Sequence, residues 1–275
     1  MNENNFGIKK RLEFIEDILR KSSPRRVLDM GCGTGIQLTI PLAKRLPGIL
    51  FKGVDDDSES VLLARKSHSL PNLEFVEACK FGTGERFDFI ILADVIEHVE
   101  DPEAFLAYLR GMLTDGGRLI ITMPNGYGPF EAVSLIQTLF QITPLYGALL
   151  KAKRAIFGSS SLPPDSHTLS SSPHINFFTY RRIQCLFQRS GFKVIQYRSR
   201  VFICGFLFDQ LMRSEFIFAW NARMADHLPP QLISSWMFLL ERNEEDQNCG
   251  FQITAYEKFR RSLISKIKPL DLRKT

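Results

Sequence analysis

The sequence predicts an α/β fold in which helices cover both faces of a doubly wound, mostly parallel sheet. Three observations lead to this prediction. Apolar segments of strand length alternate with helical segments between residues 25 and about 124. Two of the strands end in acidic residues, and a turn with glycine at every second position follows the first strand. A long, near-continuous apolar run at 87–96 is typical of a strand that is buried on both faces.

The first strand and the turn after it are the most informative segment. Residues 27–30 are apolar except for Asp29, and glycines follow at positions 31, 33 and 35. Glycine tolerates positive φ and has no Cβ, so the backbone can turn tightly and approach a ligand closely. The spacing Asp-x-Gly-x-Gly-x-Gly differs from the Gly-x-Gly-x-x-Gly of dinucleotide dehydrogenases, which disfavours an NAD-linked oxidoreductase. The turn therefore predicts a nucleoside-cofactor site.

The next strand, over residues 51–55, ends in a second candidate for this site. Its last residue, Asp55, lies twenty residues after Gly35, where a carboxylate can accept hydrogen bonds from both hydroxyls of a ribose. The neighbouring Asp56 or Asp57 is better placed to cap the helix expected over 58–66. We therefore predict that Asp55 is the ribose ligand.

The apolar strand that begins at residue 87 leads into a group of polar residues, Asp94, Glu97 and His98. Functional residues gather at such strand ends. A helix then begins at Asp101, with a capping side chain, a proline at its first position and an acid near its positive end. Its apolar residues run through position 113, a turn follows at 114–117, and a further strand is expected over 117–124.

With its leading Asp29, the glycine turn resembles motif I of the class I S-adenosylmethionine (SAM) methyltransferases, and residues 94–124 resemble the region that follows it in that family. Residues 174–180, with the helix and the Gly-Phe strand after them, resemble the group that includes ubiquinone-pathway and glycan or lipid O-methyltransferases. The resemblance implies a seven-stranded Rossmann-like methyltransferase sheet, with an antiparallel closing strand within 228–240, and SAM as cofactor. The cofactor-binding residues that it implies are Asp29, Gly31, Cys32, Gly33, Gly35, Asp55, Asp56, Cys79, Ala93 and Asp94.

Two of these positions depart from the family pattern. Cys79 stands where the family often has an aspartate that contacts the adenine amine, and Asp56 stands where a hydrophobic residue often covers the adenine ring. Ala93 is expected to contact the methionine part of SAM through its carbonyl group.

The resemblance also suggests how an acceptor would be activated. SAM carries an activated methyl group, so the protein has to align the acceptor and remove its proton. Histidine has a suitable pKa for a general base, and the candidates are His174 and His98. Alternatively, Asp94, Glu97, His98 and His174 surround a divalent cation, as in a related acid-x-x-Glu-His arrangement of some small-RNA ribose and quinone methyltransferases. Both possibilities stay open.

Residues 126–173 are expected to form a helical, apolar insertion in a methyltransferase domain that spans 1–242. No charged residue occurs from 132 to 150, and basic residues follow at 151, 153 and 154. Polar residues, a proline and a glycine interrupt the apolar run, which argues against a transmembrane helix. The insertion is either a lid over the substrate pocket or a surface that contacts an anionic membrane. Residues 243–275 are expected to be a solvated basic tail.

Composition narrows the function further. The chain has 275 residues with 44% hydrophobic and 24% charged residues, as is usual for a globular protein, and its net charge of +5 is too small and dispersed to suggest nucleic acid. Its 23 phenylalanines could form the apolar walls of a pocket for a hydrophobic acceptor. We therefore expect methyl transfer to a hydroxyl group of a small, lipid-like or glycan molecule. The alternatives are a noncatalytic SAM-binding module and an RNA ribose methyltransferase with a divalent metal.

The first nineteen residues predict an amphipathic helix, through Ile8, Leu12, Ile15 and Leu19, and not a signal peptide. The five cysteines are scattered and form no Cys-x-x-Cys pair, so we expect reduced thiols. Together these features predict a cytoplasmic protein, and association with a membrane is left open.

Overall fold

The computed structural model describes residues 5–82, 84–129, 131, 135, 174–202, 215–243 and 254–267. Within these residues the strands form one seven-stranded sheet in the order β3-β2-β1-β4-β5-β7-β6. Strand β7 runs antiparallel to both of its neighbours, and the other described pairs are parallel. The strands are β1 (Arg26–Met30), β2 (Leu50–Asp55), β3 (Leu73–Glu77), β4 (Phe87–Ala93), β5 (Leu113–Pro124), β6 (Phe192–Ser199) and β7 (Ser235–Arg242). The predicted α/β fold and its antiparallel closing strand are confirmed.

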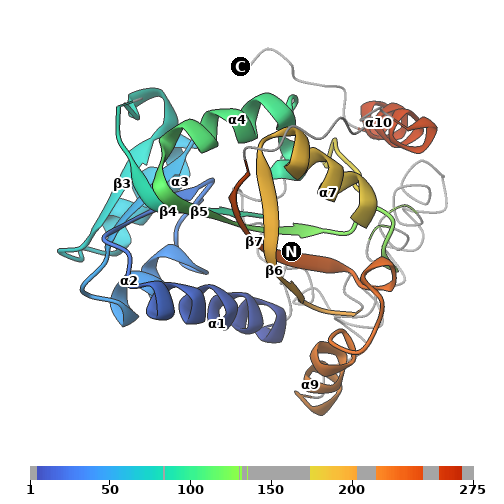
Figure 1. Ribbon diagram of the computed structural model, residues 1–275, viewed down its shortest axis with the longest axis horizontal. Coiled ribbons are helices and arrows are strands. Elements are labelled where there is room, and N and C mark those ends of the chain that lie inside the picture. Colours follow the sequence, from blue (N-terminus) through green and yellow to red (C-terminus); the bar gives the residue numbers. More distant parts are fainter. Residues whose placement is uncertain are drawn as a thin grey trace, which may run out of the picture.

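Helices cover both faces of the sheet (Figure 1). Helix α1 (Asn5–Ser22) and helix α2 (Thr39–Arg45) lie on one face, and helix α4 (Pro102–Met112) and helix α7 (Tyr180–Arg189) lie on the other. The remaining described helices are α3 (Ser58–Ser67), α9 (Glu215–Met224), α10 (Ala255–Ile267) and the 3-10 helices η1 (Ala78–Lys80), η2 (Ile96–His98) and η4 (Pro230–Leu232).

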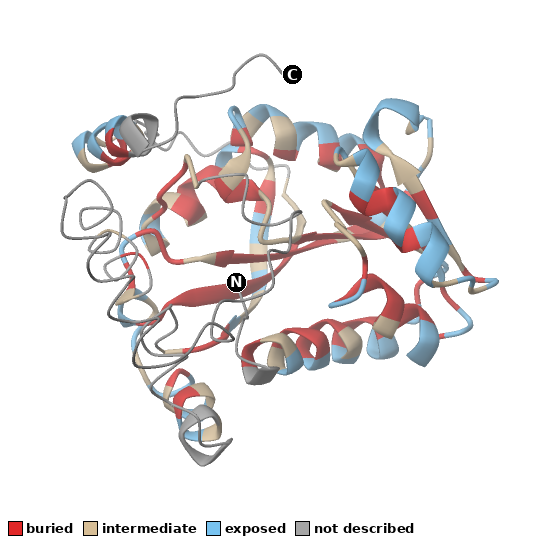
Figure 2. Cartoon of the chain, turned by 180° about the vertical axis from the view of Figure 1, so that it is seen from behind, coloured by how far each residue is buried: buried red, intermediate tan, exposed pale blue. Residues whose placement is uncertain are grey.

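The strands of the sheet are largely buried (Figure 2), and apolar side chains pack against both of its faces. On the α1 face, Ile15 and Leu19 have no exposed surface and pack with strand residues such as Phe89. On the opposite face, residues of α4 and α7 pack with Trp236 and Phe238 of β7. Removal of apolar surface from water is the main driving force for this arrangement. It also confirms the amphipathic helix predicted near the amino terminus.

The helix starts that the sequence predicts are confirmed. The side chain of Asp57 accepts hydrogen bonds from two backbone amides at the start of α3. Asp101 accepts one from the Ala104 amide at the start of α4, where Pro102 occupies an N-terminal position. Each carboxylate satisfies amides that lack partners within the helix.

The expectation of a solvated basic tail is wrong for the part of it that the structure describes. Residues 255–267 form helix α10, in which Glu257 and Arg260 are only 2% and 3% exposed. The basic composition of this segment did not predict its burial, because several of its charged side chains pair with residues in distant parts of the chain.

The cysteines also differ in part from the expectation. Cys32 and Cys79 are free thiols, as predicted, but Cys185 is disulfide-bonded. The scattered spacing gave no sign of this bond, because pairing of cysteines far apart in sequence depends on tertiary structure.

Most of the predicted apolar insertion, residues 126–173, lies outside the described residues, so its role as a lid or a membrane surface stays a prediction. Among the helices that the structure does describe, none combines the length and the apolar character needed to cross a bilayer.

The end of β5 touches the segment 174–178 backbone to backbone at Gly126. The Gly126 amide donates a hydrogen bond of 3.0 Å to the Phe178 carbonyl. A Cβ added at Gly126 would lie 2.5 Å from the Cα of Phe177, and the three atoms nearest to it all belong to the backbone. Backbone cannot move aside as a flexible side chain can, so this position requires glycine.

We therefore expect Gly126→Ala to lower the free energy of unfolding by about 1–3 kcal/mol, the usual effect of overpacking. Urea unfolding measures this change. Gly116→Ala is the matched control, because a Cβ at Gly116 meets no atom within 4 Å. Equal stability of the two variants would contradict the close approach.

Candidate active site

The glycine turn leaves open space at the carboxyl end of β1. Gly31, Gly33 and Gly35 all have positive φ, at 79°, 53° and 70°. A Cβ at Gly35 would come within 2.6 Å of the Phe75 ring, whereas a Cβ at Gly33 would meet nothing within 4 Å. The outer glycines therefore permit close packing, and the middle one faces a space in which a ligand can approach the backbone.

Asp55 closes the same site from the end of β2. One of its carboxylate oxygens accepts a hydrogen bond of 2.6 Å from the Gly33 amide, and the other accepts one of 2.9 Å from the Asp57 amide. Burial raises the pKa of Asp55, the two amide hydrogen bonds lower it, and the neighbouring Asp56 raises it further. The open space beside Gly33 and the carboxylate next to it fit the sugar of a nucleoside cofactor.

Asp29 is placed beneath the turn, with its carboxylate against α2. It is 2% exposed and accepts a hydrogen bond of 2.5 Å from the Thr39 hydroxyl. Burial raises its pKa to about 6, although the Thr39 hydrogen bond and the charge of Arg11 act in the opposite direction. Asp29 thus ties the strand that precedes the turn to the helix that follows it.

The other predicted cofactor residues lie around this pair of strand ends. Cys32 lies in the turn beside Gly53, and burial raises the pKa of its thiol. Asp56 is exposed beside Asp55, and Cys79 is exposed in η1, just after β3. Ala93 is the last residue of β4, the strand next to β1.

Asp94 follows β4 and adopts a left-handed conformation with φ of 57°, which is uncommon for a residue other than glycine. Its carboxylate pairs with Arg11 at 2.5 Å and with Arg200 at 2.9 Å. These arginines are 5% and 2% exposed, so both charges are buried. The hydroxyl of Thr122 also donates to this carboxylate at 3.3 Å.

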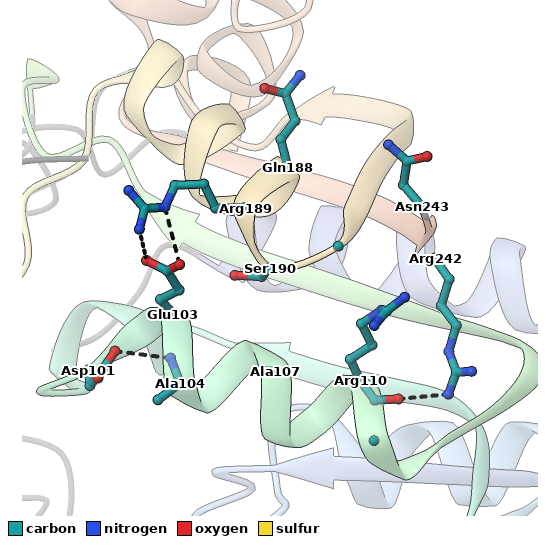
Figure 3. Close-up of a pocket in the computed structure, with 12 residues that line it drawn as sticks. Asp101, Glu103, Ala104, Ala107, Arg110, Gln188, Arg189, Ser190, Arg242 and Asn243 are labelled. Atoms are coloured by element: carbon teal, nitrogen blue, oxygen red, sulfur yellow. Dashed lines mark hydrogen bonds and ion pairs between the residues drawn. The ribbon is translucent and has the colours of Figure 1, made fainter. Parts of the chain in front are cut away.

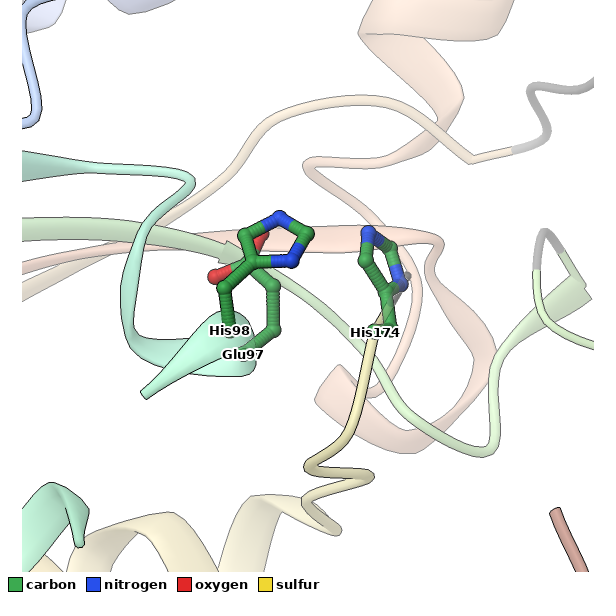
Figure 4. A group of neighbouring side chains, drawn as sticks. All are labelled: Glu97, His98 and His174. Carbon is green, nitrogen blue, oxygen red and sulfur yellow. The ribbon is translucent and has the colours of Figure 1, made fainter. Parts of the chain in front are cut away.

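A second group of polar side chains, Glu97, His98 and His174, lies beyond Asp94 (Figure 4). Each offers one ligand atom, and these atoms all lie within 4.8 Å of one another. The two imidazole rings meet edge to face, with their centres 5.0 Å apart. The structure therefore brings three of the four predicted metal ligands together. Asp94 is not in this group, because two arginines hold its carboxylate elsewhere.

His174 is held by a buried carboxylate that the sequence did not suggest. Its Nδ1 lies 2.7 Å from one oxygen of Glu131, and the other oxygen of Glu131 lies 2.7 Å from Arg260 in α10. Burial alone would lower the pKa of His174, but the hydrogen bond with Glu131 and the charges of Glu131, Glu97 and Asp94 raise it. The imidazole is thus oriented and made more basic at once.

Glu97 is 1% exposed and is fixed to the His174 segment through its backbone. Its carbonyl accepts hydrogen bonds from the amides of Ile175 and Asn176, at 2.9 and 3.0 Å. Burial raises the pKa of its carboxyl group to about 8, and the charge of Asp94 adds to this effect. The carboxyl group can therefore hold a proton near neutral pH.

The residues that sequence reasoning missed are those that orient the predicted ones: Arg11, Glu131, Asn176, Arg200 and Arg260. Glu131 was the most accessible to prediction, because it is the last charged residue before the uncharged run that begins at 132. The arginines gave no local signal, since the carboxylates that they pair with lie 83, 106 and 129 residues away.

A groove of about 980 Å³ lies apart from this site, between α4, α7 and the end of β7 (Figure 3). Arg189 pairs with Glu103 across it, and Arg242 donates to the carbonyl groups of Arg110 and Leu113. None of the residues that line it belongs to the glycine turn or to the group around His174. These contacts stabilise the packing of α7 and β7 on α4.

Comparison with known proteins gives the class of the fold and site. A family model described as a methyltransferase domain matches residues 3–197. The human mitochondrial ubiquinone biosynthesis O-methyltransferase is 32% identical over 134 residues, which is 42% of this chain and 36% of that protein. The Bradyrhizobium diazoefficiens ubiquinone biosynthesis O-methyltransferase is 33% identical over 104 residues, or 36% and 40% of the two chains. The chain thus spans well under half the length of these two relatives.

Solved structures agree on the fold. The plantazolicin methyltransferase BpumL has a TM-score of 0.52 and 16% identity, covering 88% of this chain and 87% of its own. PKMT2 from Rickettsia typhi has a TM-score of 0.51 and 17% identity, covering 81% and 51%. The chain therefore belongs to the methyltransferase-domain family, as its resemblance to the class I SAM methyltransferases predicted.

Asp55→Ala tests the ribose assignment. Loss of two hydrogen bonds to a carboxylate is expected to weaken SAM binding about 10- to 100-fold in titration calorimetry. Asp115→Ala removes an exposed carboxylate near the amino end of β5, outside the proposed cofactor contacts, and is expected to change affinity by less than about threefold. Unchanged affinity of the Asp55 variant would show that the assignment is mistaken.

The raised pKa of Asp29 predicts a pH-dependent stability difference. The folded-state pKa of about 6 exceeds the ordinary value of 3.8, so the folded protein binds this proton more tightly than the unfolded chain does. The stabilisation of the folded state by protonated Asp29 is therefore fully present below pH 4 and is lost as the pH rises through 6. Asp29→Asn should gain stability relative to the wild type over this window, by up to roughly 3 kcal/mol. Urea unfolding between pH 4 and 7 measures the difference, and a constant difference would contradict the shift.

Proposed function

We propose that the protein transfers the methyl group of SAM to a hydroxyl oxygen of a small, lipid-like or glycan acceptor. The observation that carries this proposal is the group Glu97, His98 and His174, which lies past the end of β4, the strand beside the glycine turn. This placement would put groups that bind a proton or a cation next to the reacting methyl group. The resemblance to ubiquinone biosynthesis O-methyltransferases supports an oxygen acceptor.

The glycine turn and Asp55 are the proposed cofactor contacts. In this proposal the ribose hydroxyls donate to Asp55, and the backbone of Gly31, Gly33 and Gly35 lies along the nucleoside. Cys79 and Asp56 flank the adenine, and Ala93 and Asp94 lie at the methionine end. Asp29 and Cys32 shape the turn from within. These roles follow the positions of the residues at the carboxyl ends of β1 to β4.

His174 is the proposed base. Bound SAM supplies a methyl group on a sulfonium, already activated for displacement. The chain then has to orient the acceptor hydroxyl and take its proton. The hydrogen bond from Nδ1 of His174 to Glu131 directs the other ring nitrogen as the proton acceptor and stabilises the imidazolium that forms. His98 lies edge to face with this ring and is proposed to help orient it.

A divalent cation is a second way to activate the same hydroxyl. Glu97, His98 and His174 provide the mixed oxygen and imidazole set that such ions accept, and Glu131 on His174 is the carboxylate partner that metal-bound histidines commonly have. The proposed ligand set leaves out Asp94, because its carboxylate is paired with two arginines.

Aromatic side chains near His174 favour an acceptor with an apolar body. The rings of Tyr127 and Tyr256 lie 4.5 Å apart, and Tyr256 lies 5.8 Å from Phe177. Such rings offer apolar surface to an acceptor, while the hydroxyl of Tyr127 is hydrogen-bonded to Thr254 at 2.9 Å. A lipid-like acceptor would also suit the proposed membrane contact of the apolar insertion in a protein of the cytoplasm.

Transfer of a radiolabelled methyl group tests the function. Purified protein is incubated with labelled SAM and separate lipid, glycan, small-molecule and RNA fractions. We expect label in a lipid, glycan or small-molecule fraction, and His174→Ala should reduce it at least about 100-fold, the usual contribution of general acid-base catalysis. His227→Ala is the control, because His227 is remote in sequence and follows α9.

Three other outcomes separate the alternatives. Label in RNA alone would overturn the proposed acceptor. SAM binding without label in any fraction would indicate a noncatalytic module. Full activity of chelator-washed protein, with metal content below one ion per hundred chains, would exclude the cation.

A further inference from the structure

We propose that α10 completes the acceptor site and that Arg260 is a positioning residue for His174. This inference rests on the proposed function, since it treats His174 as the group at the acceptor hydroxyl. The match to the family ends at residue 197, whereas α10 begins at Ala255. The helix therefore lies outside the part of the chain that the family model matches.

The first step of the argument is the ionic contact between Arg260 and Glu131. Arg260 is 3% exposed and Glu131 is 1% exposed, and their nitrogen and oxygen lie 2.7 Å apart. The second oxygen of the same carboxylate lies 2.7 Å from Nδ1 of His174. Because one planar carboxylate makes both contacts, a rotation that breaks one disturbs the other. Arg260 thus fixes the plane of Glu131, and Glu131 fixes the imidazole.

The second step is that α10 also holds the three residues after His174. Arg261 donates to the Ile175 carbonyl at 2.8 Å and to the Asn176 side chain at 3.0 Å. Glu257 accepts a hydrogen bond of 3.2 Å from the Phe177 amide. Side chains from consecutive turns of one helix therefore fix the backbone of this segment.

The third step is that residues 175–177 in turn fix the backbone around Glu97 and His98. The side-chain amide of Asn176 donates to the carbonyl groups of Ile96 and Val99, at 3.0 and 2.6 Å. These two carbonyl groups bracket Glu97 and His98 in sequence. Helix α10 therefore reaches His174 through Glu131 and the Glu97 backbone through Asn176, and Asn176 also holds the backbone on either side of His98.

The buried charges of Arg260 and Glu131 indicate that α10 does more than cover the surface of the domain. A salt bridge removed from water gains little net stability, because desolvation offsets the attraction between the ions. Two apolar side chains of similar size would hold the helix in place as well. The buried pair does what apolar residues cannot, since it gives His174 a fixed hydrogen-bond partner.

Substitution of Arg260 separates positioning from folding. Arg260→Gln removes the charge, Arg260→Lys keeps the charge with a different geometry, and Lys258→Gln changes an exposed residue of the same helix as the matched control. We measure turnover with the fraction that the wild type labels, KM for that fraction, and the Kd for SAM. We expect Arg260→Gln to lower kcat about 10- to 100-fold, with Kd for SAM within about twofold of the wild type. Arg260→Lys should recover part of this loss, and Lys258→Gln should match the wild type.

A spectroscopic measurement keeps the test independent of activity. The chain has five histidines, so nitrogen-15 NMR of labelled histidine resolves few signals, and the signal that is lost in His174→Gln belongs to His174. Arg260→Gln, or Arg260→Lys if the first variant does not fold, should shift the Nδ1 signal of His174. Lys258→Gln should leave it in place.

The outcomes are distinct. An unshifted His174 signal in a folded Arg260 variant overturns the proposal, as does loss of SAM affinity equal to the loss of turnover. If the wild type labels no fraction, the proposed function fails, and the His174 signal alone then decides whether Arg260 positions the ring.

Discussion

The ion pairs of Asp94 are the constraint on which the rest of the site depends. This residue turns the chain from β4 into η2 through a left-handed conformation that costs about 1–2 kcal/mol for a residue with a side chain. Arg11 from α1 and Arg200 after β6 hold its carboxylate, so three distant segments meet at one point. Because the two arginines are 5% and 2% exposed, loss of the Asp94 carboxylate would remove a counter-charge where little water can replace it. The turn that Asp94 makes directs Glu97 and His98 toward His174.

The two halves of the site are built in different ways. The cofactor half comes from adjacent parallel strands, whose carboxyl ends meet at one edge of the sheet, so the glycine turn and Asp55 are brought together by the topology alone. The acceptor half comes from η2, from Glu131, from residues 174–177 and from α10, which are joined by hydrogen bonds between buried groups. A common fold can therefore keep the first half constant while the second half changes, which is how one fold serves many acceptors.

Burial explains the unusual protonation behaviour of the site. Asp29 near the end of β1 and Glu97 in η2 are almost fully buried, and burial raises the pKa of both carboxyl groups. Burial by itself would lower the pKa of His174. The pKa is nevertheless raised, because the hydrogen bond with Glu131 and the nearby negative charges have the larger effect. In surroundings of low polarity an isolated charge raises the free energy of the folded state, whereas hydrogen bonds and ion pairs between charged groups become stronger and fix the orientation of the side chains.

The sequence by itself determined the fold class, the glycine turn, the strand-end carboxylates and the helix caps at Asp57 and Asp101, because these features depend on residues near one another in the chain or on the regular order of strands and helices. It also gave Glu97, His98 and His174 as a group. The sequence could not show that Asp94 would pair with two arginines, or that Cys185 would be disulfide-bonded. It also could not show that part of the basic tail would fold as α10 and contact Glu131, the partner of His174. Each of these contacts joins residues far apart in sequence, and only the packed chain decides which charged or reactive groups become neighbours.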